Sequence, residues 1–140
     1  MKNTTAKKSM FTTIKTSKEN KEIVTQLTRK LNLGAENVIA RLALSYSLAK
    51  ERKLSLSEIR NSHGKEYSAK VLFGDYSEFY IALICVHYKL YKSDKDIPKY
   101  IKLHIDDGLE LIYKDVERKA GITGAEFLIN EIELGMKFFE

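Results

Sequence analysis

The sequence is poor in several residue types that define structural classes. Among its 140 residues it has one cysteine, Cys85, one proline, Pro98, and no tryptophan. A single thiol cannot form an internal disulfide, which excludes a disulfide-stapled secreted fold and favours a reducing compartment. No signal peptide is recognisable, and no apolar run approaches the roughly 20 residues that a membrane span needs. We therefore expect a soluble, cytoplasmic protein that does not enter a membrane.

The sequence also lacks the motifs of the common enzyme classes. It has no glycine-rich phosphate loop, Cys-x-x-Cys, His-Glu-x-x-His or nucleophile elbow. His104 precedes Asp106 and Asp107 in a loose likeness to a metal site, but an aspartate before Gly108 more often shapes a bend. Cys85 lies in an apolar run, where a thiol serves packing. We expect no catalytic residue, no metal ligand and no cofactor.

The charges are divided unequally between the two halves of the chain. Residues 1–72 hold 15 Lys and Arg against 6 Asp and Glu, a net charge of +9, whereas residues 73–140 hold 9 against 13, a net of −4. Such asymmetry favours a polyanion-binding face and a separate face for another partner. The simpler explanation of the basic excess is that these lysines only cover a solvated surface.

Apolar periodicity predicts an all-α fold, a compact single-domain bundle of about five to seven helices. Residues 1–10 read as a flexible basic arm and residues 11–140 as one helical domain, with a short extended segment at 11–15. Ser17 should cap the first helix and Gly34 should close it. Thr123 and Glu126 form a capping box for the last helix. The other helices are expected at residues 36–52, at 77–91 as the centre of the core, and at 97–119 with an interruption or bend near Gly108.

The helix expected at residues 36–52 carries two polar side chains, Asn37 and Arg41, on one face of an otherwise apolar segment. A buried arginine needs a partner, because an unpaired charge in a core is costly. We expect Arg41 to form a structural ion pair with Glu66, with Glu36 and Glu58 as the next choices.

Basic residues in the first half are the candidate DNA contacts. They occupy the polar side of the first helix with its approach and the end of the second helix: Lys15, Lys18, Lys21, Arg29, Lys30, Lys50, Arg52 and Lys53. An extended piece followed by a basic helix, a glycine turn and a second helix also outlines a ribbon-helix-helix DNA reader. A reader of that type would not need ninety further residues of helical core.

Several separate motifs together resemble the DndE family of the bacterial DNA phosphorothioation system. They span residues 11–115 in a consistent order. The motif residues are Leu33-Gly34, Asn37, Arg41 and Ala43 to Leu48, then Gly64-Lys65-Glu66-Tyr67 and Leu72-Phe73-Gly74-Asp75-Tyr76, and finally His104-Ile105, Gly108 and Leu111.

The resemblance implies a small helical protein without enzymatic activity of its own. Such proteins act beside a cysteine desulfurase, an iron–sulfur pyrophosphatase-like protein and a coiled-coil ATPase, which together replace a non-bridging phosphate oxygen of DNA by sulfur. Members of the family contact double-stranded DNA and self-assemble, so the resemblance implies a homo-oligomer such as a tetramer.

We therefore expect a non-catalytic DNA-binding subunit that grips the duplex backbone and bridges it to the sulfur-transfer partners. A dimeric ribbon-helix-helix transcriptional regulator is the alternative, and it requires residues 11–15 to pair between two copies. An enzyme that uses His104 with Asp106 or Asp107 is a third reading. Exposed-looking aromatic residues offer apolar surface for self-association: Tyr88, Tyr91, Phe138 and Phe139.

Overall fold

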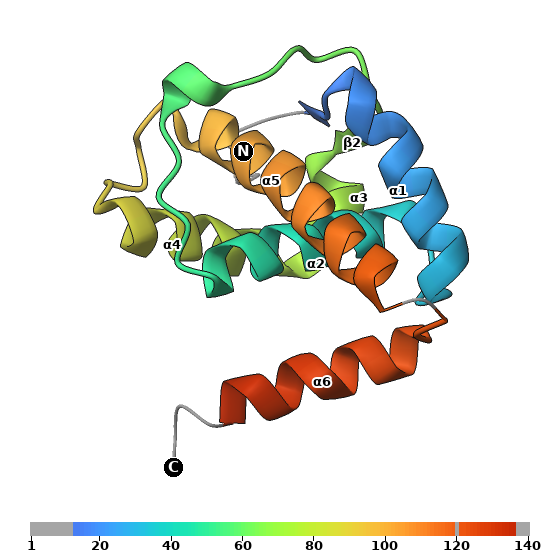
Figure 1. The fold of residues 1–140 in the computed structure, drawn as a ribbon. Helices are drawn as coiled ribbons and strands as arrows, with labels where there is room; N and C mark the ends of the chain where they lie inside the picture. Colours follow the sequence, from blue (N-terminus) through green and yellow to red (C-terminus); the bar gives the residue numbers. More distant parts are fainter. Residues whose placement is uncertain (1–12, 120, 137–140) are drawn as a thin grey trace.

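A single long helix, α5 (Ile97–Arg118), runs through the middle of the computed structural model, which describes residues 13–119 and 121–136 (Figure 1). Its fully buried apolar residues recur every three or four positions and face the other helices: Ile97, Ile101, Ile105, Leu109 and Ile112. This spacing places them along one side of the helix. The core of the domain forms around that side.

The other elements surround α5, and the all-α prediction is confirmed. A two-stranded antiparallel sheet, in which Ile14 is opposite Tyr67, is the only sheet in the described ranges. In chain order the elements are β1 (Thr13–Lys15), α1 (Lys18–Leu31), α2 (Glu36–Ala49), the 3-10 turn η1 (Leu56–Glu58), β2 (Glu66–Ser68), α3 (Ala69–Phe73), the 3-10 turn η2 (Gly74–Tyr76), α4 (Ser77–Tyr88), α5 and α6 (Gly124–Met136). The predicted arm at residues 1–10 lies outside the described residues.

The predicted helix termini are confirmed at two places and shifted at another. The side chain of Ser17 accepts a hydrogen bond from the amide of Asn20 and caps α1. Thr123 and Glu126 exchange the two hydrogen bonds of a capping box before α6. At the end of α1, however, Asn32 adopts the left-handed conformation that was expected of Gly34, with φ of 51°. Asparagine tolerates this conformation better than most residues.

Helix α5 is continuous through Gly108, so the predicted bend there is wrong. A Cβ atom on Gly108 would lie 1.8 Å from the carbonyl oxygen of Ala43 in α2. The glycine therefore serves a close approach between the backbones of α2 and α5, not a change of direction.

Helix α4 lies at the periphery, although its apolar composition predicted the centre of the core. Ile81 and Ile84 are buried, but Phe79 is 59% exposed and Val86 is 79% exposed. A helix that is apolar all round has no preferred face, so its sequence does not determine which neighbours it contacts. The central position belongs instead to α5, which is buried on nearly all sides between Ile101 and Leu109, with Lys102, His104 and Asp106 among its buried residues.

We expect Gly108→Ala to lower the free energy of unfolding. Alanine favours a helix by about 1 kcal/mol relative to glycine, but here its methyl group would force α2 and α5 apart. Overpacking of this kind costs about 1–3 kcal/mol or more. Urea denaturation should show the net loss, while Lys114→Ala on the exposed side of α5 should change stability little. A Gly108→Ala protein of equal or higher stability would contradict the close-contact explanation.

Candidate nucleic-acid interface

Three basic side chains on α1 are exposed and have no acidic partner among the described residues: Lys18, Lys21 and Arg29. Lys18 and Arg29 are eleven residues apart and share one side of the helix. At 1.5 Å per residue the row extends for about 16 Å. Duplex DNA presents one phosphate charge per about 1.7 Å of its axis, so a row of this length can meet several phosphates.

A buried lysine fixes the start of this row. Lys102 of α5 is 7% exposed, and its Nζ donates to the carbonyl oxygens of Lys15 and Asn61, both at 2.8 Å. Nζ also lies 3.0 Å from a carboxylate oxygen of Asp106, one helical turn further along. All three donor positions of the ammonium group are therefore used.

The other carboxylate oxygen of Asp106 holds the beginning of α1. It accepts hydrogen bonds from the amide of Ser17 at 3.0 Å and from the side chain of Asn20 at 2.7 Å. Asp106 is 3% exposed, so both bonds form away from water. The pair Lys102–Asp106 thus ties β1, the first turn of α1 and the loop at Asn61 to the central helix. We call this set of contacts the α5 clasp.

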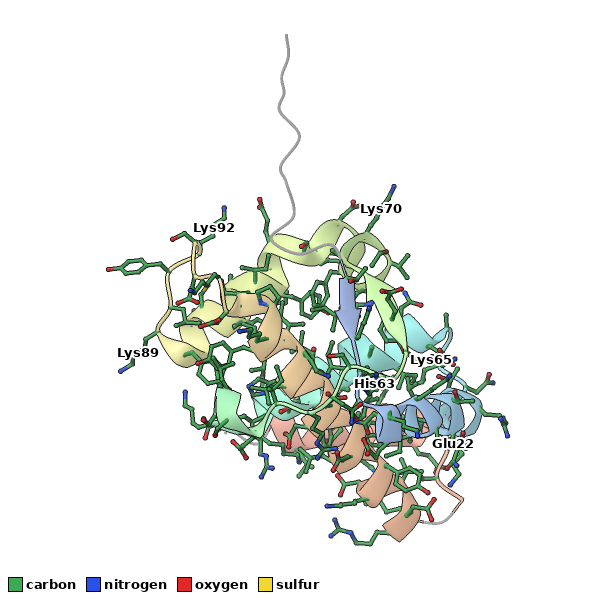
Figure 2. All side chains as sticks on the ribbon, turned by 90° about the horizontal axis from the view of Figure 1, so that it is seen from above. Glu22, His63, Lys65, Lys70, Lys89 and Lys92 are labelled. Atoms are coloured by element: carbon green, nitrogen blue, oxygen red, sulfur yellow. The ribbon has the colours of Figure 1, made fainter. Side chains whose placement is uncertain are left out.

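The loop that follows Asn61 packs closely against the same junction. A Cβ atom on Gly64 would lie 2.1 Å from the carbonyl oxygen of Ser17, so only glycine fits there. The amide of Thr16 donates to the carbonyl oxygen of Lys65 at 2.8 Å. Figure 2 shows the labelled His63 and Lys65 on this side of the molecule, away from Lys89 and Lys92.

The other predicted DNA contacts are engaged within the chain. Lys15 pairs with Glu66 at 3.6 Å, and Lys30 pairs with Glu117. At the end of α2, Lys50 lies 3.7 Å from Glu131 and above the ring of Tyr46. These lysines are half-exposed, but each already has a carboxylate beside it.

Arg52 and Lys53 are also engaged. The guanidinium of Arg52 binds both carboxylate oxygens of Asp107, at 2.9 and 3.2 Å. Lys53 donates to the carbonyl oxygen of His87 and lies over the ring of Tyr88. The structure therefore separates the predicted residues into a row on α1 and a group at the end of α2, on different sides of α5 (Figure 1).

Arg41 does not form the predicted ion pair with Glu66. Glu66 is exposed and faces Lys15, while Arg41 is half-buried and has no hydrogen bond or ion pair in residues 13–119 and 121–136. The other two predicted partners of Arg41 are engaged elsewhere, since Glu36 pairs with Lys65 and Glu58 caps η1 at Ser55. Its neighbour on the helix face, Asn37, donates to the carbonyl oxygen of Val71.

A second polar network lies on the opposite side of the Gly108 contact. The donor and the acceptor of each of its hydrogen bonds can be assigned. Asp107 only accepts, so Ser47 Oγ donates to it at 2.7 Å and accepts in turn from His104 Nδ1 at 2.7 Å. His104 Nε2 then accepts from the hydroxyl of Tyr88 at 2.6 Å, and the oxygen of Tyr88 accepts from the amide of Leu54. The sequence of bonds requires a neutral histidine with its proton on Nδ1.

Burial lowers the pKa of His104 to about 4, and the neighbouring His87 adds to the effect. Burial likewise raises the pKa of Tyr88. Ser47 and His104 are both fully buried, so neither side chain can reach a molecule in solution. No group of three or more His, Cys, Asp or Glu within the described part of the chain could hold a metal ion. None of the described helices is long and apolar enough to cross a membrane.

A family model described as "DNA sulphur modification protein DndE" matches residues 13–120. The chain belongs to the DndE family. The match includes β1 to α5 and therefore both polar networks, whereas α6 begins after it. Among curated proteins no significant match was found.

Two solved DndE structures have a similar fold. One is DndE from Escherichia coli B7A, involved in DNA phosphorothioation modification, with 17% identity and a TM-score of 0.59. The other is a glycine-to-lysine mutant of DndE involved in DNA phosphorothioation, with 18% identity and a TM-score of 0.61. Each comparison covers 73% of this chain and 97% of the other. At such low identity the likeness concerns the fold.

Sequence reasoning missed both polar networks of this DndE chain. The spacing of Lys102 and Asp106, four residues apart in a helix, is the signal that could have indicated the clasp. No comparable signal joins Ser47 to His104, because they lie 57 positions apart on different helices.

We expect Asp106→Ala to destabilise the protein by about 3–5 kcal/mol, since it leaves the buried ammonium group of Lys102 without its counter-charge. Urea denaturation followed by circular dichroism measures the loss. Asp75→Ala, at an exposed carboxylate, is the matched control and should change stability by less than about 0.5 kcal/mol. Equal stability of the two variants would show that the Lys102–Asp106 pair contributes little to the free energy of unfolding.

The lowered pKa of His104 predicts a loss of stability in acid. The unfolded chain binds a proton near the usual pKa of 6.5, whereas the folded chain binds it only near 4. Stability should therefore be complete above pH 6.5 and fall as the pH is lowered towards 4. Melting temperatures measured across this range should fall less steeply for His104→Gln. The variant His63→Gln, at an exposed histidine, should keep the slope of the original protein.

Proposed function

We propose that this DndE chain is a non-catalytic DNA-binding subunit of the phosphorothioation machinery, which grips the duplex backbone and bridges it to the sulfur-transfer partners. The observation that supports this most strongly is the row of exposed cations on α1, which have no acidic partner in the described ranges and are held in place by the α5 clasp. The family match places the chain in DNA sulphur modification. The row offers a surface by which it would meet the DNA.

The row suits phosphates better than bases. Two of its three cations are lysines, which are compact charges on flexible stems, whereas base recognition uses planar groups fixed in a groove. Contacts of this kind hold the duplex in a register and carry no sequence information of their own. A subunit that positions DNA for other proteins needs this property. Holding the phosphate in place can lower the barrier of the following reaction by several kcal/mol.

The partners we propose are an iron–sulfur pyrophosphatase-like protein and a coiled-coil ATPase, together with further copies of the chain in a homo-oligomer such as a tetramer. Residues 73–140 carry a net charge of −4, opposite in sign to the DNA-binding row, which favours a different partner for that half of the chain. A non-catalytic role is supported by the buried position of Ser47 and His104, the pair closest in type to a nucleophile and its base.

A ribbon-helix-helix regulator is less favoured by the position of β1. In that class of protein the N-terminal strands of two copies pair with each other. Here β1 pairs with β2 of the same chain over Thr13↔Ser68, Ile14↔Tyr67 and Lys15↔Glu66. Sequence-specific binding to one palindrome would restore the regulator as the leading explanation.

The triple variant Lys18→Ala, Lys21→Ala, Arg29→Ala should bind every duplex more weakly. In the original protein each of these cations displaces counterions from the DNA on binding, and the variant loses this favourable release. If about four or five cations contact phosphates, the slope of log affinity against log salt is roughly −4 and should fall to about −1 in the variant. Fluorescence anisotropy with unrelated duplexes at several salt concentrations measures both quantities.

The charge-matched control is Lys95→Ala, Lys99→Ala, Lys114→Ala, which removes three exposed lysines from other surfaces. It should keep nearly the original slope. In cells, the α1 triple variant should fail to restore phosphorothioate dinucleotides to a strain that lacks the gene, and the control should restore them. Equal slopes for the two triple variants would refute the α1 row as the DNA contact.

A further inference from the structure

The loop at residues 61–65 is fixed to the start of α1 by the side chain of Asn61. Its Oδ1 accepts a hydrogen bond from the amide of Lys18 at 2.9 Å and another from the amide of His63 at 3.1 Å. The first cation of the α1 row and His63 therefore share one acceptor atom and lie next to each other. Figure 2 shows His63 near the start of α1, on which Glu22 is also labelled.

The same loop is held on both sides of His63. Before it, the carbonyl oxygen of Asn61 accepts from Lys102 as part of the α5 clasp. After it, the amide of Gly64 donates to the carbonyl oxygen of Thr16 at 2.9 Å. Since only glycine fits at position 64, the backbone of the loop lies directly on the junction between β1 and α1. The structure thus fixes the place of His63 relative to the α1 row.

The imidazole of His63 is available for a ligand. It is exposed and has no hydrogen bond or ion pair with the residues that the structure describes. The chain has two other histidines: His104 is fully buried with its pKa lowered to about 4, and His87 donates to the carbonyl oxygen of Arg52 beside the end of α4. Histidine is the side chain that ordinarily changes its charge between about pH 5 and 8. Protonation in this range can therefore add a positive charge beside the α1 row.

The charges at the start of the α1 row cancel. Residues 17–24 contain Lys18 and Lys21 against Glu19 and Glu22, a net charge of zero. Glu22 lies one turn after Lys18 and on the same side of the helix. A hydrogen bond from its own amide lowers the pKa of Glu19, whose carboxylate faces the first turn of α1. One added cation at this point makes the start of the row net positive.

The other charged groups around the loop are already engaged with each other. They come from α5, from the loop itself and from η1. The pairs are Lys102 with Asp106, Arg60 with Glu110 and Lys65 with Glu36, while Glu58 caps η1 at Ser55. None of them supplies a free cation to the start of α1.

We propose that His63 is a fourth cation of the α1 row, which contacts a DNA phosphate when its imidazole is protonated. This inference rests on the DNA-binding role proposed above, to which it adds a contact and a dependence on pH. A protonated imidazole has two N–H donors and forms a charge-assisted hydrogen bond with a phosphate oxygen. Because only the protonated form carries the charge, the affinity for DNA rises as the pH falls.

The test compares DNA binding at pH 8 and at pH 5.5. Fluorescence anisotropy with unrelated duplexes at several salt concentrations measures affinity and its salt dependence. Each neutralised phosphate adds about 0.9 to the slope of log affinity against log salt. The slope should therefore be steeper by about 0.9 at pH 5.5, and the affinity at about 0.1 M salt should be up to about eightfold higher. Circular dichroism at both pH values verifies that the protein is folded.

Two variants of His63 isolate its contribution. His63→Gln is neutral at both pH values, so it should bind at pH 5.5 as weakly as the original protein binds at pH 8. His63→Lys is charged at both, so it should bind at pH 8 about as tightly as the original protein binds at pH 5.5. His87→Gln, which removes a histidine beside the end of α4, is the matched control and should keep the full pH dependence.

The outcomes separate this inference from the DNA-binding role. Equal affinity at the two pH values, with the duplex bound at both, overturns the inference and leaves the DNA-binding role standing. The inference is equally overturned if His63→Gln keeps the full pH dependence. A protein that binds no duplex at either pH refutes both proposals.

Discussion

The close contact between α2 and α5 at Gly108 constrains the rest of the structure. With the carbonyl oxygen of Ala43 lying where a Cβ atom would stand, the two backbones meet without side chains between them. Protein interiors are packed too densely to absorb a displacement at such a point. The short distance between α2 and α5 therefore fixes the relative positions of the groups on each side of the contact, including those of the two polar networks.

Those networks use the polar residues of α5 for different purposes. On one side Lys102 and Asp106 bind backbone groups of β1, α1 and the loop at Asn61, and so determine where α1 begins. On the other side Asp107 and His104 connect α5 to Ser47 of α2 and to Tyr88 at the end of α4. Buried polar groups that are fully satisfied in this way specify one arrangement of helices, because any other arrangement leaves a group unpaired.

The arrangement of the helices also decides which basic side chains lie beside a carboxylate and which do not. Composition places eight candidate DNA contacts in the basic half of the chain, yet Lys30, Lys50 and Arg52 lie against carboxylates. Lys18, Lys21 and Arg29 remain exposed on α1. An occupied cation must lose its partner before it meets a phosphate, so the unpaired row is the better candidate surface.

The sequence by itself determined the five longer helices, several of their ends and the family, but not the short helix α3 or the strand β2. Local signals sufficed there, because apolar spacing and capping side chains act between residues a few positions apart. This is why Ser17 and Thr123 were identified correctly as caps. The tertiary structure alone decided that α5 and not α4 is central, that Gly108 is a contact and not a bend, and that Glu66 faces Lys15 instead of Arg41. Each of these depends on groups that are distant in sequence, and their pairing is set by how the helices pack and which buried charges can be satisfied together.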